Sequence, residues 1–329
     1  MNRRHKKSSL SVLVGVLLLV IVLIGCGLRL MDSAAFLHNE QKPQQAVSER
    51  KTITVDGVDY YPRQDITVIL AMGIDTEGEM VDSGSYNNDG EADVISLIIF
   101  DEVEENCTVL NLNRDSMVDM PVLGVDGRKA GTAYQQLALS HTYGSGLEDS
   151  CENTKATVSK LLNNIYIDYY FAANMDAIAI ANDAVGGVTV NVTDDFSNMT
   201  DAIPMGQVTL KGKQATNFVR MRKEVGDQLN ISRMERHKEY IDGFMQSLQA
   251  KRTEGDSFFY SMYADISPYI VTDLSANALS GMYSRYEGYE LKDIISPKGE
   301  NVRGENFMEF YLDEAALDKM ILDVFYKEK

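Results

Sequence analysis

The sequence contains no tryptophan and only three cysteines and six prolines among its 329 residues. One cysteine, Cys26, lies in an apolar N-terminal run, so only Cys107 and Cys151 belong to the rest of the chain. Two cysteines do not form a disulfide framework, and this pair matches no zinc or redox motif. A single disulfide between them is one interpretation, but we expect two small apolar side chains in the core.

Basic residues are also scarce, because 31 Lys and Arg stand against 49 Asp and Glu, which gives a formal net charge of -18. Such a chain lacks the broad basic surface that nucleic acid requires, so we exclude a nucleic-acid partner. With 44% hydrophobic and 24% charged residues, the chain is long enough for one large folded domain or two smaller ones. Any basic site must therefore be a focused pocket.

The arginines are nevertheless concentrated in one stretch of the sequence. Four of them fall between positions 220 and 236, namely Arg220, Arg222, Arg233 and Arg236. The rigid fork of an arginine fits phosphate oxygens with two hydrogen bonds, so the cluster predicts a bound anion, in particular a phosphate. The alternative is a solvated helix face whose arginines pair with Glu224, Asp227 and Glu235.

The N-terminus predicts a membrane anchor. Residues 1–7 are basic, and an almost unbroken apolar run from Leu10 to Leu28 is long enough to span a bilayer as a helix. We therefore expect a cytoplasmic tail at 1–7, a transmembrane anchor at 8–31, and the remaining chain on the extracytoplasmic face of the cell membrane. The run lacks a small-x-small cleavage site, which disfavours a cleaved signal peptide. A lipoprotein attached through Cys26 is the alternative, because residues 23–26 resemble a lipoprotein box.

Residues 32–65 are polar and mixed, which predicts an extracytoplasmic stalk, with a hairpin at 52–61 that turns at Asp56-Gly57. From residue 66 onward, short apolar runs predict strands at Ile66–Met72, Val94–Phe100, Thr108–Asn113, Tyr169–Ala173 and Val188–Val192. Helical spacing predicts helices at Thr132–His141, Asn153–Leu162, Asp176–Ala184, Lys213–Lys223 and Arg233–Leu248.

These elements predict the α/β class: a mixed central β-sheet flanked by helices on both faces, an α-β-α sandwich, behind one N-terminal transmembrane helix. We expect the main domain at 66–248. Residues 249–329 would be a C-terminal α/β extension packed on it, with helices at Ala276–Tyr286 and Glu314–Tyr326 and a strand at Met308–Leu312.

Three polar residues lie at predicted strand ends. Asp75 and Arg114 follow their strands, whereas Asp93 precedes one, so an antiparallel neighbour would bring all three to one sheet edge. Two carboxylates with arginines nearby suit a Mg²⁺ ion that shares its coordination with a phosphorylated ligand. The alternative is that Asp75 and Asp93 are turn residues.

At this point a series of motifs in residues 66–248 resembles the LytR-CpsA-Psr family of the Gram-positive cell envelope. In order, they are Ile69-Leu-Ala-Met-Gly-Ile-Asp75, Ala92-Asp-Val-Ile95, Leu112-Asn-Arg-Asp115, Lys129-Ala-Gly-Thr-Ala-Tyr134, Ile167-Asp-Tyr-Tyr170, Ala184-Val-Gly-Gly-Val188, Leu210-Lys-Gly-Lys-Gln-Ala215, Val219-Arg-Met-Arg222 and Arg233-Met-Glu-Arg236. The resemblance makes 66–248 the catalytic domain. It implies a phosphotransferase that moves a glycopolymer from a polyprenyl-pyrophosphate carrier to a peptidoglycan acceptor and releases polyprenyl phosphate.

The resemblance also implies roles for individual residues. Asp75 and Asp93 would hold Mg²⁺, with Mn²⁺ as the alternative metal. The pyrophosphate would be bound by Arg114, Arg220, Arg222, Arg233 and His237. Beside this set, Asp115 is the candidate acceptor of the sugar hydroxyl's proton. The catalytic set is therefore Asp93, Arg114, Asp115, Arg220 and Arg222.

Three departures from the family pattern stand out. Glu91 replaces a common arginine, His237 replaces a common glutamine, and the segment between Asp227 and Arg233 is longer than usual. These changes bear on the substrate more than on the reaction class. Two further functions use the same residues: a pyrophosphatase, with water in place of the sugar hydroxyl, and a non-catalytic lipid-pyrophosphate binding or regulatory protein.

Overall fold

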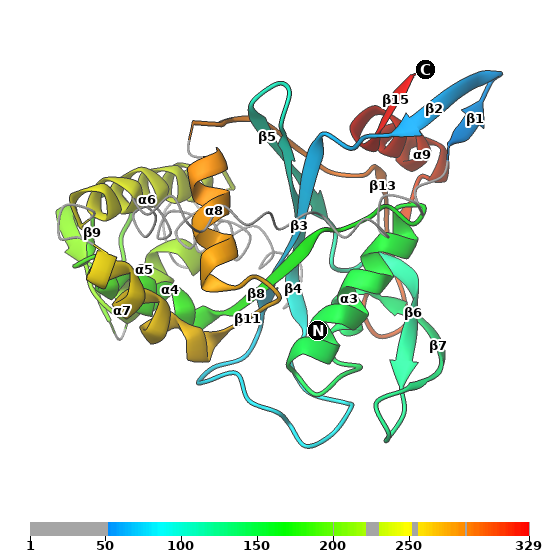
Figure 1. Cartoon of the computed structure of the whole chain (residues 1–329). Coiled ribbons are helices and arrows are strands. Elements are labelled where there is room, and N and C mark those ends of the chain that lie inside the picture. The colour runs from blue at the N-terminus through cyan, green and yellow to red at the C-terminus, as the bar shows by residue number, and fades with distance from the viewer. Residues whose placement is uncertain (1–51, 200, 222–229, 252–255, 287, 329) are drawn as a thin grey trace.

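The computed structural model of the chain describes residues 52–199, 201–221, 230–251, 256–286 and 288–328 (Figure 1). The predicted cytoplasmic tail, transmembrane anchor and Cys26 lipid site lie outside the described residues. Within those ranges, no helix is long and apolar enough to cross a membrane.

A mixed six-stranded sheet forms the centre of the fold. Its strands, in spatial order, are β11 (Ile270–Thr272), β8 (Tyr169–Asn174), β3 (Ile66–Ile74), β4 (Ala92–Asp101), β5 (Asn106–Leu112) and β12 (Glu290–Ile295). The β8–β3 and β5–β12 pairs are parallel, whereas β11–β8, β3–β4 and β4–β5 are antiparallel. The apolar runs therefore predicted the central strands correctly.

Both faces of the sheet are buried, which is why its central strands are apolar on both sides. In β3, Ile69 and Ala71 face one hydrophobic core, and Val68, Leu70 and Met72 face the other. Burying each such Leu, Ile or Val side chain stabilises the fold by about 1.5–3 kcal/mol. A polar substitution at any of these positions would therefore be strongly destabilising.

Helices cover both faces, as the sequence predicts (Figure 1). The first core packs against α4 (Met175–Ala184), α5 (Lys213–Arg220), α6 (Asn230–Lys251), α7 (Asp256–Ile266) and α8 (Ala276–Tyr286). The second packs against α3 (Glu148–Leu161) and α9 (Glu314–Phe325). Short 3-10 helices lie at Leu137–Ser140 and Ser267–Tyr269.

Smaller sheets surround this core. They are β1 (Ile53–Val55) and β2 (Val58–Pro62) with β15 (Tyr326–Glu328), β6 (Met117–Leu123) with β7 (Lys129–Gln136), β9 (Val188–Val192) with β10 (Gly206–Leu210), and β13 (Gly299–Arg303) with β14 (Met308–Leu312). The hairpin predicted at 52–61 is confirmed, with positive φ at Asp56 and Gly57. Because β15 pairs with β2, this end of the predicted stalk belongs to the folded unit.

The C-terminal residues share the core of the main domain. Strands β11 and β12 form the two edges of the central sheet. In α8, the ring of Tyr286 stacks on that of Phe100 in β4, with centroids 4.1 Å apart. The expected boundary after residue 248 therefore does not separate two cores.

One predicted helix is wrong. The segment Thr132–His141 belongs mostly to β7, which pairs with β6, and ends in the short 3-10 helix Leu137–Ser140. The turn of the β6–β7 hairpin lies at Asp126-Gly127, where Gly127 has a φ of 72°. An Asp-Gly pair between two short segments is a hairpin signal, and it outweighs the weak helical spacing that follows it.

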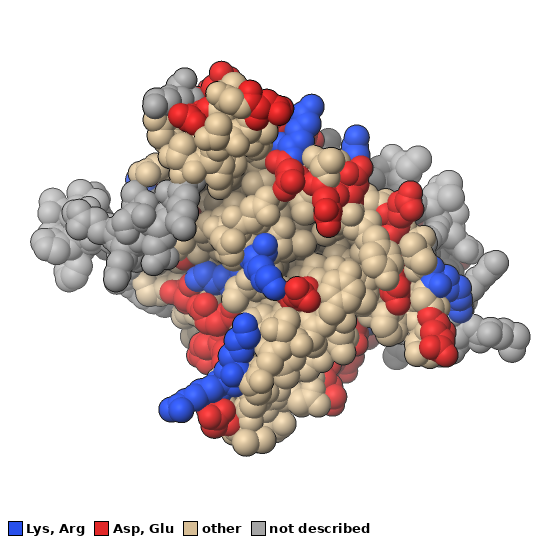
Figure 2. All heavy atoms as spheres, turned by 90° about the vertical axis from the view of Figure 1, so that its right-hand side faces the viewer, with Lys and Arg blue, Asp and Glu red and all other residues tan. Residues whose placement is uncertain are grey.

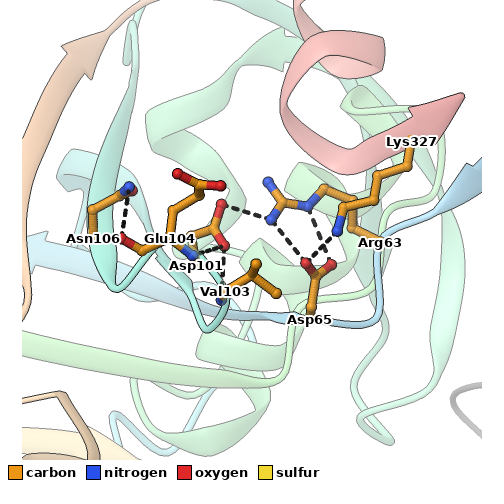
Figure 3. Close-up of polar contacts among 7 residues, drawn as sticks. All are labelled: Arg63, Asp65, Asp101, Val103, Glu104, Asn106 and Lys327. Carbon is orange, nitrogen blue, oxygen red and sulfur yellow. Dashed lines mark hydrogen bonds and ion pairs between the residues drawn. The ribbon is translucent and has the colours of Figure 1, made fainter.

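A charged cluster attaches both ends of the described chain to the sheet (Figure 3). Arg63 donates to Asp101 at 2.6 Å and to Asp65 at 3.2 and 3.3 Å, and Lys327 of β15 also donates to Asp65. Burial alone would raise the pKa of both carboxyls. The hydrogen bonds from Arg63, and for Asp65 from Lys327, outweigh burial and lower each pKa below its usual range.

Candidate active site

The polar residues predicted at strand ends meet at one edge of the sheet. β3 ends at Ile74, one residue before Asp75, and β4 begins at Ala92, one residue before Asp93. The two strands are antiparallel, and the backbone N–H of Asp75 donates to the carbonyl of Glu91 at 3.0 Å. The prediction that an antiparallel neighbour brings the two aspartates to the same edge of the sheet is confirmed.

Asp93 is the extra residue of a β-bulge. The register pairs Gly73 with Val94 and Ile74 with Ala92, so Asp93 is inserted between two paired positions. Bulges redirect side chains and are common beside active sites. The side chain of Asp93 is buried, with 6% of the residue exposed, so the bulge directs a carboxylate into the protein.

Arg114 lies two residues after the end of β5 and binds this buried carboxylate. Its guanidinium forms an ion pair with Asp93 and lies 3.6 Å from carboxylate oxygens of both Glu91 and Asp115. The sequence predicts that Asp93 occupies a solvent-filled site without a buried ion pair. That expectation is wrong, because Asp93 and Arg114 form such a pair.

Arg220 reaches the same edge from a helix. It is the last residue of α5, and one of its guanidinium nitrogens lies 3.9 Å from Asp75, with both side chains about half exposed. The next residue, Met221, has the extended dihedrals φ −72° and ψ 140°. The helix predicted at Lys213–Lys223 therefore ends at Arg220, so Arg220 lies at a helix terminus that faces Asp75.

Arg236 explains where α5 ends. This residue of α6 is 4% exposed, and its guanidinium donates to the carbonyls of Phe218, at 3.2 Å, and of Met221. It also forms an ion pair with Asp194 and lies over the ring of Phe196. Because its donors are used within the protein, Arg236 stabilises the fold and is not part of the predicted anion cluster.

The remaining members of the cluster cannot be placed in the same way. Arg222 lies outside the described residues. Arg233 and His237 belong to α6, but their side chains are not among those that the structure describes. Their predicted contacts with a pyrophosphate stay predictions.

Asp115 adjoins Arg114 and is held by a residue that the sequence did not single out. Its Oδ1 accepts a hydrogen bond from Nε2 of Gln136 at 2.8 Å, and the same amide donates to the carbonyl of Met308 at 2.8 Å. The backbone carbonyl of Asp115 accepts from the N–H of Phe310 at 2.8 Å. Strand β14, near the C-terminus, therefore contributes to the position of the candidate base.

The loop between β3 and β4 is held by hydrogen bonds to the segment that precedes α3. The side-chain amide of Asn88 donates to the carbonyls of His141, at 2.9 Å, and Gly144, at 2.8 Å, and Nδ1 of His141 lies 2.8 Å from the carbonyl of Gly90. Burial lowers the pKa of His141 to about 4, so this residue is a neutral structural group at pH 7. His141 is therefore part of the packing that supports this loop.

The two cysteines of the described chain are free, as expected. Cys151 is buried and Cys107 is partly buried. Burial raises the pKa of Cys107 to about 12, so its thiol is protonated and unreactive at pH 7. Neither residue adds chemistry to the site.

Comparison with known proteins decides the family. The sequence model described as the LytR_cpsA_psr family matches residues 31–323. This chain belongs to the LytR-CpsA-Psr family. The match extends into α9, so it includes most of the C-terminal part that the motif series did not reach.

Relatives within the LytR-CpsA-Psr family cover most of the chain. A polyisoprenyl-teichoic acid–peptidoglycan teichoic acid transferase TagU from Oceanobacillus iheyensis is 27% identical over 83% of this chain and 80% of its own length. Among solved structures, Bacillus subtilis TagV has a TM-score of 0.55 at 21% identity and covers 80% of this chain and 96% of its own. A structure described as TagT bound to LI-WTA has a TM-score of 0.53 at 20% identity, with coverage of 80% and 91%. These structures share the mixed α/β fold.

The resemblance to the LytR-CpsA-Psr family implies a divalent metal, and the donor set fits Mg²⁺. Asp75 and Asp93 place two carboxylates at one sheet edge, and Mg²⁺ commonly takes one or two carboxylates while water and substrate phosphate complete its coordination. No group of three His, Cys, Asp or Glu residues in the described chain could hold a metal.

Proposed function

We propose that this chain is a membrane-anchored extracytoplasmic phosphotransferase of the LytR-CpsA-Psr family. It transfers a glycopolymer from a polyprenyl-pyrophosphate carrier to peptidoglycan and releases polyprenyl phosphate. Its relatives are named as teichoic acid transferases, so a teichoic acid linked to a polyprenyl carrier is the first donor to test.

The observation that carries this proposal is the pairing of carboxylates with arginines at the sheet edge where β3 ends and β4 begins. Asp93 pairs with Arg114, and Asp75 lies 3.9 Å from Arg220. Carboxylates suit a divalent cation and guanidiniums suit phosphate oxygens. The four side chains thus supply both halves of a metal-pyrophosphate site in a chain whose net charge of -18 would otherwise repel an anion.

Phosphoryl transfer asks the protein mainly to position the reactants and to neutralise charge. Arg114 and Arg220 bind non-bridging oxygens of the pyrophosphate, with Arg222, Arg233 and His237 as further proposed contacts. Asp75 and Asp93 would hold Mg²⁺, with Mn²⁺ as the alternative, and the ion would supply positive charge beside the pyrophosphate.

Asp115 accepts the proton in this mechanism. The acceptor hydroxyl forms a bond to the phosphorus that carries the glycopolymer, and the bond from that phosphorus to the bridging oxygen breaks. The hydroxyl proton passes to the carboxylate of Asp115, and the electrons of the broken bond leave with polyprenyl phosphate. The amide of Gln136 holds the carboxylate in place by donating a hydrogen bond to its Oδ1 at 2.8 Å.

The test is transfer of a synthetic polyprenyl-pyrophosphate oligosaccharide to a peptidoglycan fragment. Arg220→Lys keeps the charge but loses the fork, so it should lose roughly 10- to 100-fold in rate, nearly as much as Arg220→Ala. Arg285→Lys is the matched control. Arg285 lies on α8, is more than half exposed, and lies 3.5 Å from a carboxylate oxygen of Glu102. A rate near that of the wild type for Arg220→Lys would overturn the assignment.

The products separate the alternatives in the same assay. Release of free oligosaccharide phosphate without acceptor labelling would indicate a pyrophosphatase. Binding of the lipid without any product would indicate a binding or regulatory protein. Activity in excess EDTA would overturn the metal assignment.

The membrane topology is tested separately. Protease added to intact protoplasts should digest the domain if residues 1–7 are cytoplasmic and residues 8–31 span the membrane. Full protection would overturn that topology. A mature chain that begins at an acylated Cys26 would indicate the lipoprotein alternative.

A further inference from the structure

An exposed aromatic surface lies beside the candidate base, on two strands that also support Asp115. Tyr134 of β7 is 54% exposed and Tyr311 of β14 is 41% exposed. Both strands also hold Asp115, through the amide of Gln136 and the N–H of Phe310. We call Tyr134, Tyr311 and the neighbouring carboxylates of Glu300 and Glu309 the tyrosine platform.

The register places the two tyrosines close to Asp115. Tyr134 precedes Gln136 by two residues, so both side chains lie on the same face of β7, about 7 Å apart along the strand. Tyr311 follows Phe310, whose N–H bonds to the backbone of Asp115. Phe310 also bridges to Ser116, and Met117 at the start of β6 pairs with Gln136 of β7, so β14 and β7 both lie next to the start of β6.

The carboxylates limit what can bind there. The hydroxyl of Tyr311 donates to Glu309 at 2.6 Å, and Glu300 is the cross-strand partner of Tyr311. In an antiparallel pair, opposite residues lie on the same face, so Glu300 shares the face of Tyr311. Figure 2 shows the side of the molecule that carries β6, β7 and β13, where acidic and basic side chains are interspersed with uncharged surface. An anionic polymer such as a teichoic acid would be repelled by the two glutamates.

A neutral sugar chain fits this combination. The C–H face of a pyranose ring packs on an exposed tyrosine, whose ring is rigid and apolar, and carboxylates accept hydrogen bonds from sugar hydroxyls. We propose that the tyrosine platform binds the glycan backbone of the peptidoglycan acceptor and presents its hydroxyl to Asp115. This proposal rests on the proposed transferase function and names the subsite of its second substrate.

The experiment separates binding from transfer. The full-length protein in mild detergent is titrated with chitotetraose, a neutral analogue of the glycan backbone, and with polyglycerol phosphate as the anionic probe. Saturation-transfer NMR should show chitotetraose contacts with the wild type that are lost in the double variant Tyr134→Ala/Tyr311→Ala. Because binding needs no turnover, this result is independent of whether the chain is a transferase.

Kinetics then connect the surface to the reaction. Each alanine variant should raise the KM for the peptidoglycan fragment by roughly two- to tenfold, with the KM for the lipid donor unchanged. Tyr134→Phe and Tyr311→Phe keep the rings and should stay within about twofold of the wild type. Tyr61→Ala is the control, because Tyr61 is equally exposed, at 41%, but lies on β2 in a different sheet.

Several outcomes would overturn the proposal. They are chitotetraose binding that survives the double variant, polyglycerol phosphate binding that depends on the tyrosines, and a concentration-dependent dimer that only the alanine variants lose. A rise in donor KM equal to that for the acceptor would also do so, because it would indicate general damage to the site. If chitotetraose binds through the tyrosines but no transfer occurs, the subsite stands and the proposed reaction fails.

Discussion

Replacing the buried Arg236 by methionine tests whether this arginine stabilises the fold, as the structure indicates, or binds an anion, as its place in the sequence predicts. Its guanidinium holds one carboxylate, Asp194, and two carbonyls, those of Phe218 and Met221. Removing one partner of a buried ion pair costs about 3–5 kcal/mol, because the other charge stays buried. That is a large part of a typical stability of about 5–15 kcal/mol.

The expected loss is measurable by thermal unfolding. In a domain of this size, 1 kcal/mol corresponds to roughly 2–4 °C, so Arg236→Met should lower the Tm by about 6–20 °C in circular dichroism of the detergent-solubilised protein. The Arg220→Met variant is the control, because Arg220 is half exposed and should change the Tm by less than about 2 °C. If the two variants melt together while only Arg236→Met loses lipid binding, the structural role of Arg236 is refuted.

Three further predictions concern the site and its supports. Asp93→Asn should abolish transfer and also lower the free energy of unfolding by about 1–3 kcal/mol, because it breaks the pair with Arg114; unchanged melting would contradict the buried pair. The folded pKa of Asp65 is depressed, so its stabilising contribution is present above about pH 4 and is lost as the pH falls below that value. The protection factor of the Lys327 backbone amide in β15, taken relative to the intrinsic exchange rate at each pH, should therefore fall in acid, and not in an Asp65→Asn variant that is already loosened. His141 has a folded pKa of about 4 against about 6.5 when unfolded, so the stability it contributes is lost as the pH falls from about 6.5 to about 4; His141→Gln should flatten the dependence of Tm on pH in that window.

The central sheet could be predicted because burial on both faces leaves a simple signature. Strands such as β3 and β4 are apolar at nearly every position, and only a covered strand tolerates that pattern in a folded domain. The hairpin at Asp56-Gly57 was equally readable, since positive φ favours that residue pair. These parts of the fold follow from local sequence and burial alone.

Strand β7 could not be found in the same way. Its residues are mostly exposed and polar, so neither apolar alternation nor a helical stripe identifies them. The turn at Asp126-Gly127 was the available signal, and it would also have pointed to Gln136 as a strand residue. Strands β11 and β12 were missed because one has only three residues and the other is exposed along its length.

Within the candidate site, the strand ends placed Asp75, Asp93 and Arg114 correctly, because side chains that follow or precede buried strands must emerge at a sheet edge. The bulge at Asp93 was beyond sequence reasoning, since an inserted residue is recognised only against its partner strand. The burial of the pair with Arg114 depends on that bulge. The sequence could therefore identify the Asp93 carboxylate, but not the buried ion pair that determines how much stability is lost when Asp93 is replaced.

The arginine cluster shows the same division within one motif. Arg220 and Arg236 are similar in sequence context, yet one is half exposed beside Asp75 and the other is buried against the end of α5. Side chains two residues apart on a helix point in different directions, so Arg220 and Arg222 could not share a ligand if one helix continued through both. Arg236 binds the carbonyls of Phe218 and Met221, and α5 ends at Arg220. Helical spacing therefore does not prevent Arg220 from sharing a ligand with a later residue of the motif. By ending α5 at Arg220, the buried Arg236 makes it chemically reasonable that Arg220 binds an anion together with a later residue of the motif.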